Sequence, residues 1–280
     1  MTPAALSGPD PCLLHGGVTA QEETCRVAVV AELFPTVSET FVLHHVTGLL
    51  DLGFEVDIYA FDREGLEYYG HAELDSYGLL ERLYYLPRAL EGSTELQQMA
   101  ERDYDVVHCH FGEVSQRICA LKPLLPKARF LVTFHGRDIR LATERGGDIY
   151  RETFELFDGV VSICEYNSGR LLELGCPTGT LLDLPIGVDT RLFSPGSIDR
   201  LPSEMLRVVT VARLHPDKHI PFALRAMRKL LDTPERFHYT VAGHGAQRGE
   251  LEALINEYGL EQHVTLLGQC SQEEVIEILL

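Results

Sequence analysis

The feature that most constrains the fold is a steady alternation of short apolar runs with amphipathic helical stretches. Strands are predicted over residues 25–31, 54–60, 105–111, 129–134, 159–164, 180–184, 206–212, 237–242 and 264–267. Helices are predicted from Ser38 to just before Gly53, over 113–122, 166–174, 220–232 and 247–258, and from Ser271 onward. Strands and helices that alternate at these lengths form βαβ units, with parallel strands and helices on both faces of the sheet. The pattern therefore predicts an α/β protein with doubly wound sheets.

Composition divides the chain into four segments. Residues 1–24 contain prolines and glycines without periodicity, which predicts a flexible N-terminal tail. One α/β domain then spans 25–195, a linker with Ser, Pro and Gly spans 196–204, and a second domain spans 205–280. The final predicted helix has an apolar tip at 275–280, and a domain that ended there would leave a sheet edge and an apolar helix face uncovered. We therefore expect an incomplete second domain whose tip favours self-association.

The charge balance limits the partners. The chain has 24 Lys and Arg residues against 42 Asp and Glu residues, a formal net charge of −18. Such a balance argues against nucleic acid as the main ligand and disfavours broad docking on anionic lipid. A phosphorylated small molecule stays compatible, because a few local cations and helix N-termini suffice to bind it.

The cysteines and the apolar runs indicate in which cell compartment the protein is found. None of the seven cysteines forms a CxxC pair, which is typical of reduced thiols in a cytosolic protein. The N-terminus lacks the basic head and long apolar stretch of a signal peptide, and no apolar run is long enough to cross a bilayer. We expect a cytoplasmic protein whose contact with the inner face of the membrane, if it has one, is peripheral.

Two cations follow the first strand of the second domain. Arg213 stands at the end of that strand, and Lys218 lies five residues later, near the next helix. In open α/β sheets ligands bind at the carboxyl ends of strands, where these cations would neutralise a diphosphate. Solvated loop charges explain the same two residues equally well.

Two glycines follow the next strand of that domain. Gly243 and Gly245 flank His244 between a strand and a helix, so the backbone could approach a phosphate at the helix N-terminus. The fingerprint is incomplete, because the third glycine is displaced to Gly249 and no acidic residue follows at the usual distance. An ordinary turn between strand and helix is the alternative.

Histidines mark the strand ends of the first domain. His135 follows a strand and would face a cleft, where a neutral imidazole can hydrogen-bond a sugar, although a lone His is more often structural. His108 and His110 alternate on another strand and share a face. No third ligand lies at a recognisable spacing, so we predict no metal site.

Seven motifs, in order along residues 25–280, resemble those of the family 4 glycosyltransferases, in particular those that build bacterial exopolysaccharides such as colanic acid. They lie at 34–41, 108–112, 134–138, 162–167, 185–193, at Arg213 with Lys218, and at 243–245. The resemblance implies a GT-B fold, two Rossmann-like domains of which the second is incomplete here. It also implies retention at the anomeric carbon and no obligatory metal or other cofactor.

The resemblance further implies roles for individual residues. Arg213, Lys218, Gly243 and Gly245 would bind the diphosphate of a nucleotide-sugar donor, and His135 would be the catalytic residue beside the transferred sugar. The remaining positions would line the cleft on the side of a saccharide or lipid-linked saccharide acceptor; they are Ser38, Glu39, Thr40, His110 and Asp138.

The sequence also departs from the family pattern. Ala212 and His219 stand where the family usually has glycine, and the family's block of two glutamates eight positions apart would come after Leu280. We therefore expect a hexosyltransferase of polysaccharide assembly in truncated form, with impaired activity. Alternatives are a non-catalytic module that binds a nucleotide sugar or a partner, and a sugar-nucleotide epimerase of similar fold.

Overall fold

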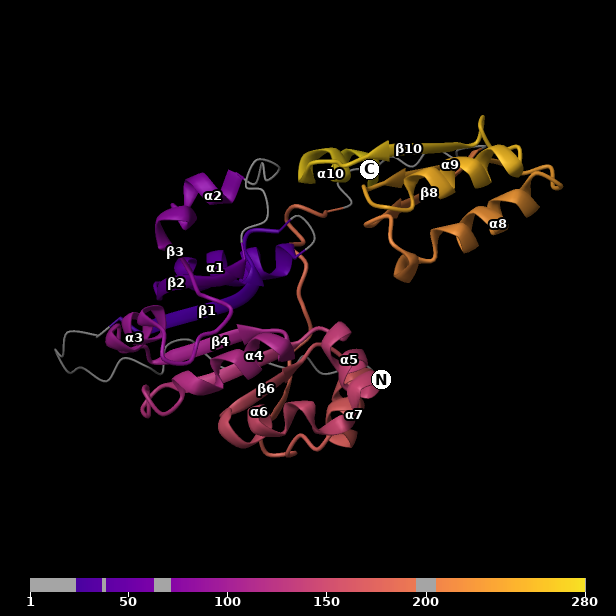
Figure 1. The fold of residues 1–280 in the computed structure, drawn as a ribbon. Coiled ribbons are helices and arrows are strands. Elements are labelled where there is room, and N and C mark those ends of the chain that lie inside the picture. The colour runs from indigo at the N-terminus through magenta and orange to yellow at the C-terminus, as the bar shows by residue number, and fades with distance from the viewer. Residues whose placement is uncertain (1–23, 37–38, 63–71, 195–204, 280) are drawn as a thin grey trace, which may run out of the picture. The chain divides into compact units, whose positions relative to one another are not determined.

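The computed structural model describes residues 24–36, 39–62, 72–194 and 205–279 (Figure 1). The predicted linker at 196–204, and all of the predicted tail except Thr24, lie outside these residues. The chain divides into two compact units, one with a seven-stranded sheet and one with a three-stranded sheet.

The sheet of the first unit is parallel throughout. Its strands are β1 (Arg26–Leu33), β2 (Glu55–Asp62), β3 (Leu83–Tyr85), β4 (Val106–His110), β5 (Arg129–Phe134), β6 (Gly159–Ser162) and β7 (Leu181–Asp183). They are arranged in the order β3-β2-β1-β4-β5-β6-β7. The chain therefore adds strands on one side of β1 and then returns to its other side with β4. This reversal is a topological switch point, and ligands of open α/β sheets bind beside it, at the carboxyl ends of the strands.

Helices connect these strands. They are α1 (Thr40–Asp51), α2 (Ala72–Ser76), α3 (Thr94–Glu101), α4 (Gly112–Ile118), α5 (Arg137–Arg145), α6 (Arg151–Leu156) and α7 (Glu165–Glu173), with 3₁₀ turns η3 (Leu79–Arg82), η4 (Cys119–Leu121) and η5 (Gly147–Tyr150). Residues 28–31 of β1 have no exposed surface at all. Such burial on both faces explains why the central strands are continuous apolar runs rather than alternating ones.

The second unit repeats the architecture on a smaller scale. Its strands β8 (Met205–Val211), β9 (Arg236–Ala242) and β10 (Val264–Gly268) are parallel, in the order β10-β9-β8. Its helices are η6 (Pro216–Lys218), α8 (Ile220–Leu230), α9 (Arg248–Glu257) and α10 (Gln272–Leu279). The buried core joins side chains of β9 to those of α8 and α9; the most buried are Leu214, Ile220, Leu224, Tyr239, Val241, Leu251 and Leu260.

The predicted strands and helices are confirmed, with ends within two residues of their expected positions, except that the helix predicted over 113–122 is α4 followed by the 3₁₀ turn η4. The prediction was incomplete in the polar parts of the first unit. It left out α2, β3 and α3 in the stretch 62–104, and it also left out α5 and α6. These helices are short, and each buries few side chains, so they leave little periodicity in the sequence.

His219, the residue that precedes α8, has a backbone conformation that residues with a side chain disfavour. Its φ of 50° and ψ of 31° lie in the left-handed region. Its carbonyl accepts the Phe222 N–H at 2.9 Å, and its own N–H donates to the Pro216 carbonyl at 3.0 Å, so the turn is fixed on both sides. A glycine at this position would adopt the conformation without steric cost.

We therefore predict opposite effects of two substitutions at His219. His219→Gly should raise the free energy of unfolding by up to about 1 kcal/mol, whereas the β-branched His219→Val should lower it by about 1–2 kcal/mol. Urea denaturation measures both. Gln262→Gly is the matched control, because Gln262 is exposed in a turn and its φ is not positive; it should lower stability slightly. A destabilised His219→Gly variant would show that the left-handed turn is not strained.

Candidate functional site

A chain of histidines lies at the carboxyl ends of β4 and β5. His110 ends β4, His135 follows β5, and His45 reaches them from α1. The Nδ1 atom of His45 lies 3.0 Å from Nε2 of His110, and the Nδ1 atom of His110 lies 3.1 Å from Nε2 of His135. His108 stacks on His110 at a centroid distance of 5.2 Å, and its Nε2 lies 2.8 Å from Oγ1 of Thr133. His110 thus uses both ring nitrogens and links His45 to His135.

Burial keeps these imidazoles neutral. It lowers the pKa of His45 to about 4, and the pKa of His135 likewise to about 4 with a smaller contribution from His45. Burial also holds the pKa of His108 and of His110 well below the ordinary value, helped by the neighbouring histidines. At neutral pH each ring therefore has one N–H donor and one acceptor nitrogen. The cluster can direct hydrogen bonds, but it supplies no positive charge.

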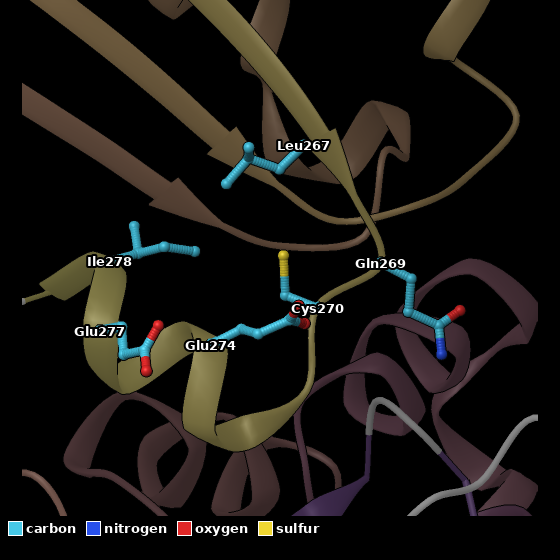
Figure 2. Close-up of a pocket in the computed structure, with 6 residues that line it drawn as sticks. All are labelled: Leu267, Gln269, Cys270, Glu274, Glu277 and Ile278. Carbon is cyan, nitrogen blue, oxygen red and sulfur yellow. The ribbon is translucent and has the colours of Figure 1, made fainter.

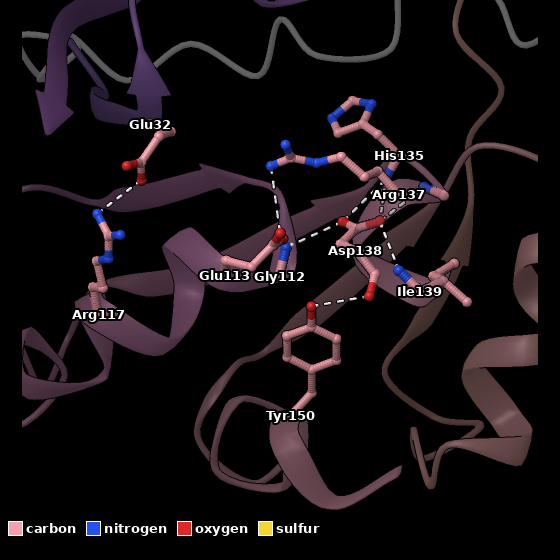
Figure 3. Close-up of polar contacts among 10 residues, drawn as sticks. Glu32, Gly112, Glu113, Arg117, His135, Arg137, Asp138, Ile139 and Tyr150 are labelled. Atoms are coloured by element: carbon pink, nitrogen blue, oxygen red, sulfur yellow. Dashed lines mark hydrogen bonds and ion pairs between the residues drawn. The ribbon is translucent and has the colours of Figure 1, made fainter. Parts of the chain in front are cut away.

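The carboxylate of Asp138 holds the backbone that carries His135 (Figure 3). It accepts N–H groups from Gly112 at 3.1 Å, His135 at 3.1 Å, Gly136 at 2.8 Å and Ile139 at 3.0 Å. Asp138 is fully buried, with an exposed fraction of 0%. Burial raises its pKa to about 6, while the hydrogen bonds from Gly112 and His135 favour the ionised form. The side chain predicted to line the cleft therefore points inward and joins the ends of β4 and β5.

The turn from β4 into α4 is sterically tight. Phe111 has a φ of 75° and a ψ of 140°, a combination that L-residues rarely adopt. A Cβ atom on Gly112 would lie 2.5 Å from the Phe134 ring and 2.7 Å from the Tyr150 ring, so only glycine fits there. The Phe111 ring packs against the His135 ring at a centroid distance of 4.5 Å. The side chain of Phe111, in this strained turn, therefore also packs against the His135 ring.

Two further polar contacts surround this turn. Arg137 pairs with Glu113 at 3.4 Å, and its guanidinium lies over the Phe111 ring at 5.6 Å. The Tyr150 hydroxyl donates to the Asp138 carbonyl at 3.0 Å (Figure 3). The start of α5 is therefore fixed by contacts from α4 and η5 as well as by its own first turn.

The segment predicted to line the acceptor side is described in part. Ser38 lies outside the described residues. Glu39 and Thr40 are half-buried at the start of α1, and the Glu39 N–H donates to Oγ1 of Thr36 at 3.0 Å. His110, assigned to the same role, is only 4% exposed. Both of its ring nitrogens face other histidines, Nε2 towards His45 and Nδ1 towards His135.

In the second unit the predicted cations are exposed. Arg213 follows β8, and Lys218 ends η6. Among the described residues, neither side chain has an ion pair or a hydrogen bond, whereas Arg228 and Arg248 in the same unit pair with Asp232 and Glu252. Two uncompensated cations beside one strand end are available to an anionic ligand.

Gly243 and Gly245 are required by the backbone that they touch. A Cβ atom on Gly243 would lie 1.8 Å from the Ala212 carbonyl oxygen, and one on Gly245 would lie 2.5 Å from that of Leu214. The Leu214 N–H donates to the His244 carbonyl at 2.9 Å. The glycine loop and the Arg213 loop are therefore packed backbone to backbone. This packing accounts for both glycines before any phosphate is considered.

A pocket of about 340 Å³ lies between β10 and α10 (Figure 2). Its lining residues are Leu267, Gln269, Cys270, Glu274, Glu277 and Ile278. The carboxylates of Glu274 and Glu277 disfavour an anionic ligand there. Glu274 also caps α10, because its Oε2 accepts the Ser271 N–H at 2.7 Å. This pocket is therefore no candidate for the diphosphate.

The described part of the chain contains neither a cluster of metal-binding side chains nor a helix that could cross a membrane. No three His, Cys, Asp or Glu side chains within it are grouped so that they could hold a metal ion. Of the helices described, none combines the length and the apolar character that crossing a membrane requires.

Sequence reasoning missed His45. The available signal was its place in α1, since Val42 and Val46 on the same helix are buried while the preceding His44 is exposed. Helical periodicity therefore turns His45 towards the sheet and His44 towards solvent.

The sequence is similar to those of bacterial glycosyltransferases. Putative colanic acid biosynthesis glycosyltransferase WcaL of Escherichia coli (strain K12) is 28% identical over 289 residues, covering 88% of this chain and 71% of that protein. Amylovoran biosynthesis glycosyltransferase AmsK of Erwinia amylovora is 28% identical, covering 86% of this chain and 70% of that protein.

Solved structures share the fold. The crystal structure of Anabaena Alr3699/HepE in complex with UDP and glucose matches with a TM-score of 0.66 at 13% identity, over 88% of this chain and 70% of that one. The apo form of the lipopolysaccharide outer core galactosyltransferase WaaB matches with a TM-score of 0.59 at 13% identity, over 90% and 70%. The predicted α/β GT-B fold is confirmed.

Two family models match the chain. The model described as Glycosyltransferase Family 4 matches residues 38–192, and the model described as Glycosyl transferases group 1 matches residues 198–280. Because the first model alone covers more than half of the sequence, the chain belongs to glycosyltransferase family 4, whose members are retaining transferases.

Proposed function

We propose that this chain transfers a hexose from a nucleotide-diphosphate sugar to a saccharide or lipid-linked saccharide acceptor in polysaccharide biosynthesis. The observation that carries the proposal is the pair of uncompensated cations, Arg213 and Lys218, beside the carboxyl end of β8. Support comes from relatives named for colanic acid and amylovoran biosynthesis, and from a similar structure that holds UDP and glucose. The transfer would take place in the cytoplasm, with any membrane contact peripheral.

The charge that develops on the leaving nucleoside diphosphate indicates which residues would bind the donor. A nucleoside diphosphate gains negative charge as its bond to the sugar breaks, so fixed cations stabilise the transition state more than the ground state. Arg213 would bind the diphosphate through its planar fork, and Lys218 would act as a point charge. Gly243 and Gly245 would contribute by keeping the Arg213 loop in place, since they pack against its backbone.

The neutral histidines suggest that the first unit acts on the sugar by hydrogen bonding and not by positive charge. Because its pKa is about 4, His135 would act on the transferred sugar as a hydrogen-bonding imidazole and not as a cation. His110 and Asp138 would position it. We assign Ser38, Glu39 and Thr40 to the acceptor side, with 25–195 as the acceptor domain and 205–280 as the donor domain.

The first prediction concerns binding of the leaving group. Arg213→Ala should weaken the binding of UDP, or of whichever of UDP, GDP and ADP binds best, by roughly tenfold to hundredfold, because hydrogen bonds to charged groups contribute about 1.5–3 kcal/mol. Lys218→Ala should weaken it less, because an ammonium makes no bidentate contact. Isothermal titration calorimetry measures both.

Arg228→Ala is the control for this measurement, because Arg228 is in the same unit but pairs with Asp232 at 3.1 Å. The Arg228→Ala variant should bind the nucleoside diphosphate with the same affinity as the wild type. Unchanged affinity in Arg213→Ala would contradict the assignment of the cations. Binding that depends on Arg213 but is followed by no sugar transfer would favour the alternative of a non-catalytic nucleotide-sugar module.

The second prediction follows from the neutral imidazoles. Between pH 6.5 and 4 the unfolded chain takes up protons that the buried histidines do not, so the free energy of unfolding should fall as the pH is lowered through this range. His45 and His135 each contribute on the order of 3 kcal/mol to this loss. Asp138 acts in the opposite direction between pH 6 and about 4, because its folded form binds a proton more readily. The combined effect of the four histidines on the free energy of unfolding should exceed that of the one carboxyl group.

Urea denaturation at pH 7 and at pH 5 tests this prediction. The fall in stability should be smaller in His45→Phe than in the wild type, and His44→Phe should keep the full fall because His44 is exposed. Stability that is constant or that rises on acidification would show that the histidine cluster is charged, and not neutral, in the folded state.

A further inference from the structure

The three linked histidines can adopt only two arrangements of protons. In one, Nδ1–H of His45 donates to His110 and Nδ1–H of His110 donates to His135. In the other, Nε2–H of His135 donates to His110 and Nε2–H of His110 donates to His45. Each N···N contact has room for a single hydrogen, so a neutral chain has no third arrangement in which both contacts are hydrogen bonds.

The consequence is that the tautomers of the three rings are coupled. In the first arrangement all three rings carry the proton on Nδ1, and in the second all three carry it on Nε2. The Nδ1 atom of His135 is therefore a donor in the first and an acceptor in the second. The proton position on a ring of α1 is thus coupled to the hydrogen-bonding character of a ring at the end of β5.

We propose that His45 and His110 are positioning residues that tie the tautomer of His135 to their own, so that its Nδ1 atom donates or accepts a hydrogen bond according to the arrangement that the three rings share. This inference rests on the proposed function, in which that ring acts on the transferred sugar. His45 does not need to touch the sugar for this role. It acts through His110, which is only 4% exposed and has both ring nitrogens engaged.

The packing of the rings keeps both N···N contacts of the histidine chain in place. The His110 ring lies between His108 and His135, with centroid distances of 5.2 Å and 5.3 Å and interplanar angles of 5° and 23°. The His45 ring meets both His108 and His110 edge-on, at 4.6 Å and 5.1 Å. Rings packed in this way cannot turn over without displacing one another, so the contacts that set the tautomer are held in place.

Side-chain ¹⁵N NMR of the full chain labelled with ¹⁵N-histidine tests the proposal, because it distinguishes Nδ1–H from Nε2–H in each ring. We expect His45, His110 and His135 to be neutral and to share one tautomer. We expect His45→Phe to change the ¹⁵N shifts of both His110 and His135. His44→Phe, one residue earlier on the same helix and exposed, should leave them unchanged.

Two results would overturn the proposal. One is a wild-type chain in which His110 and His135 hold different tautomers, and the other is a His45→Phe variant whose His135 shifts equal those of the wild type. If the phenylalanine variant does not fold, His45→Asn serves instead, because its amide group lies close to the place of the imidazole Nδ1. Asn can donate or accept there, so His110 keeps a hydrogen-bonding partner and should still share its tautomer with His135; different tautomers in these two rings would overturn the proposal in this variant as well.

Kinetics separate this inference from the proposed function. Where transfer is measurable, His45→Phe should lower kcat by roughly tenfold to hundredfold through misdirected hydrogen bonding at His135, while nucleoside diphosphate affinity stays unchanged. An unchanged kcat together with a changed His135 tautomer would overturn the role in transfer. A chain that transfers no sugar but shows the coupled tautomers would refute the proposed function and leave the coupling itself intact.

Discussion

The first unit depends on one buried carboxylate. Asp138 has no exposed surface and accepts N–H groups from Gly112 at the end of β4 and from His135 and Gly136 at the end of β5. These donors belong to backbone that no strand partner satisfies, and leaving them unpaired inside the protein would cost about 1–3 kcal/mol each. The carboxylate is therefore what allows two strand ends to be buried close together. The strained turn at Phe111 and the position of the His135 ring both follow from that junction.

The second unit holds its strand ends together in a different way. No buried carboxylate ties its loops among the described residues; instead, Gly243 and Gly245 let one loop pack directly on the carbonyl groups of Ala212 and Leu214. The difference fits the chemistry proposed for each unit. A negative charge beside Arg213 would compete with a diphosphate for the cation, whereas beside the neutral His135 a carboxylate serves only to fix the backbone. The two units therefore carry a similar architecture with opposite electrostatic requirements at their strand ends.

Much of this could be predicted from the sequence, and the limits have physical causes. Strands such as β1 are buried on both faces and leave continuous apolar runs, while α5 is largely polar and buries only Asp138, Ile139 and Ala142. The chain position of Arg213 predicts its place at a strand end, since topology alone brings it there. The inward direction of Asp138 and the approach of His45 to His110 depend on three-dimensional packing that no local pattern encodes. For the same reason, Gly243 could be predicted as a glycine of the strand–helix turn but not as a contact of Ala212.

The measurement that tests the role of Asp138 most directly is native-state hydrogen exchange in Asp138→Asn. An asparagine replaces one acceptor oxygen by an N–H₂ group that opposes the backbone donors, so at least one of the Gly112 and Gly136 amides loses its partner. We predict that the amide that loses its partner exchanges roughly five- to hundredfold faster than in the wild type, as a cost of about 1–3 kcal/mol implies, while the amides of β9 in the second unit keep their protection. Equal protection of the Gly112, His135 and Gly136 amides in the variant and the wild type would contradict the account, because the junction of β4 and β5 would then be held by something other than this carboxylate.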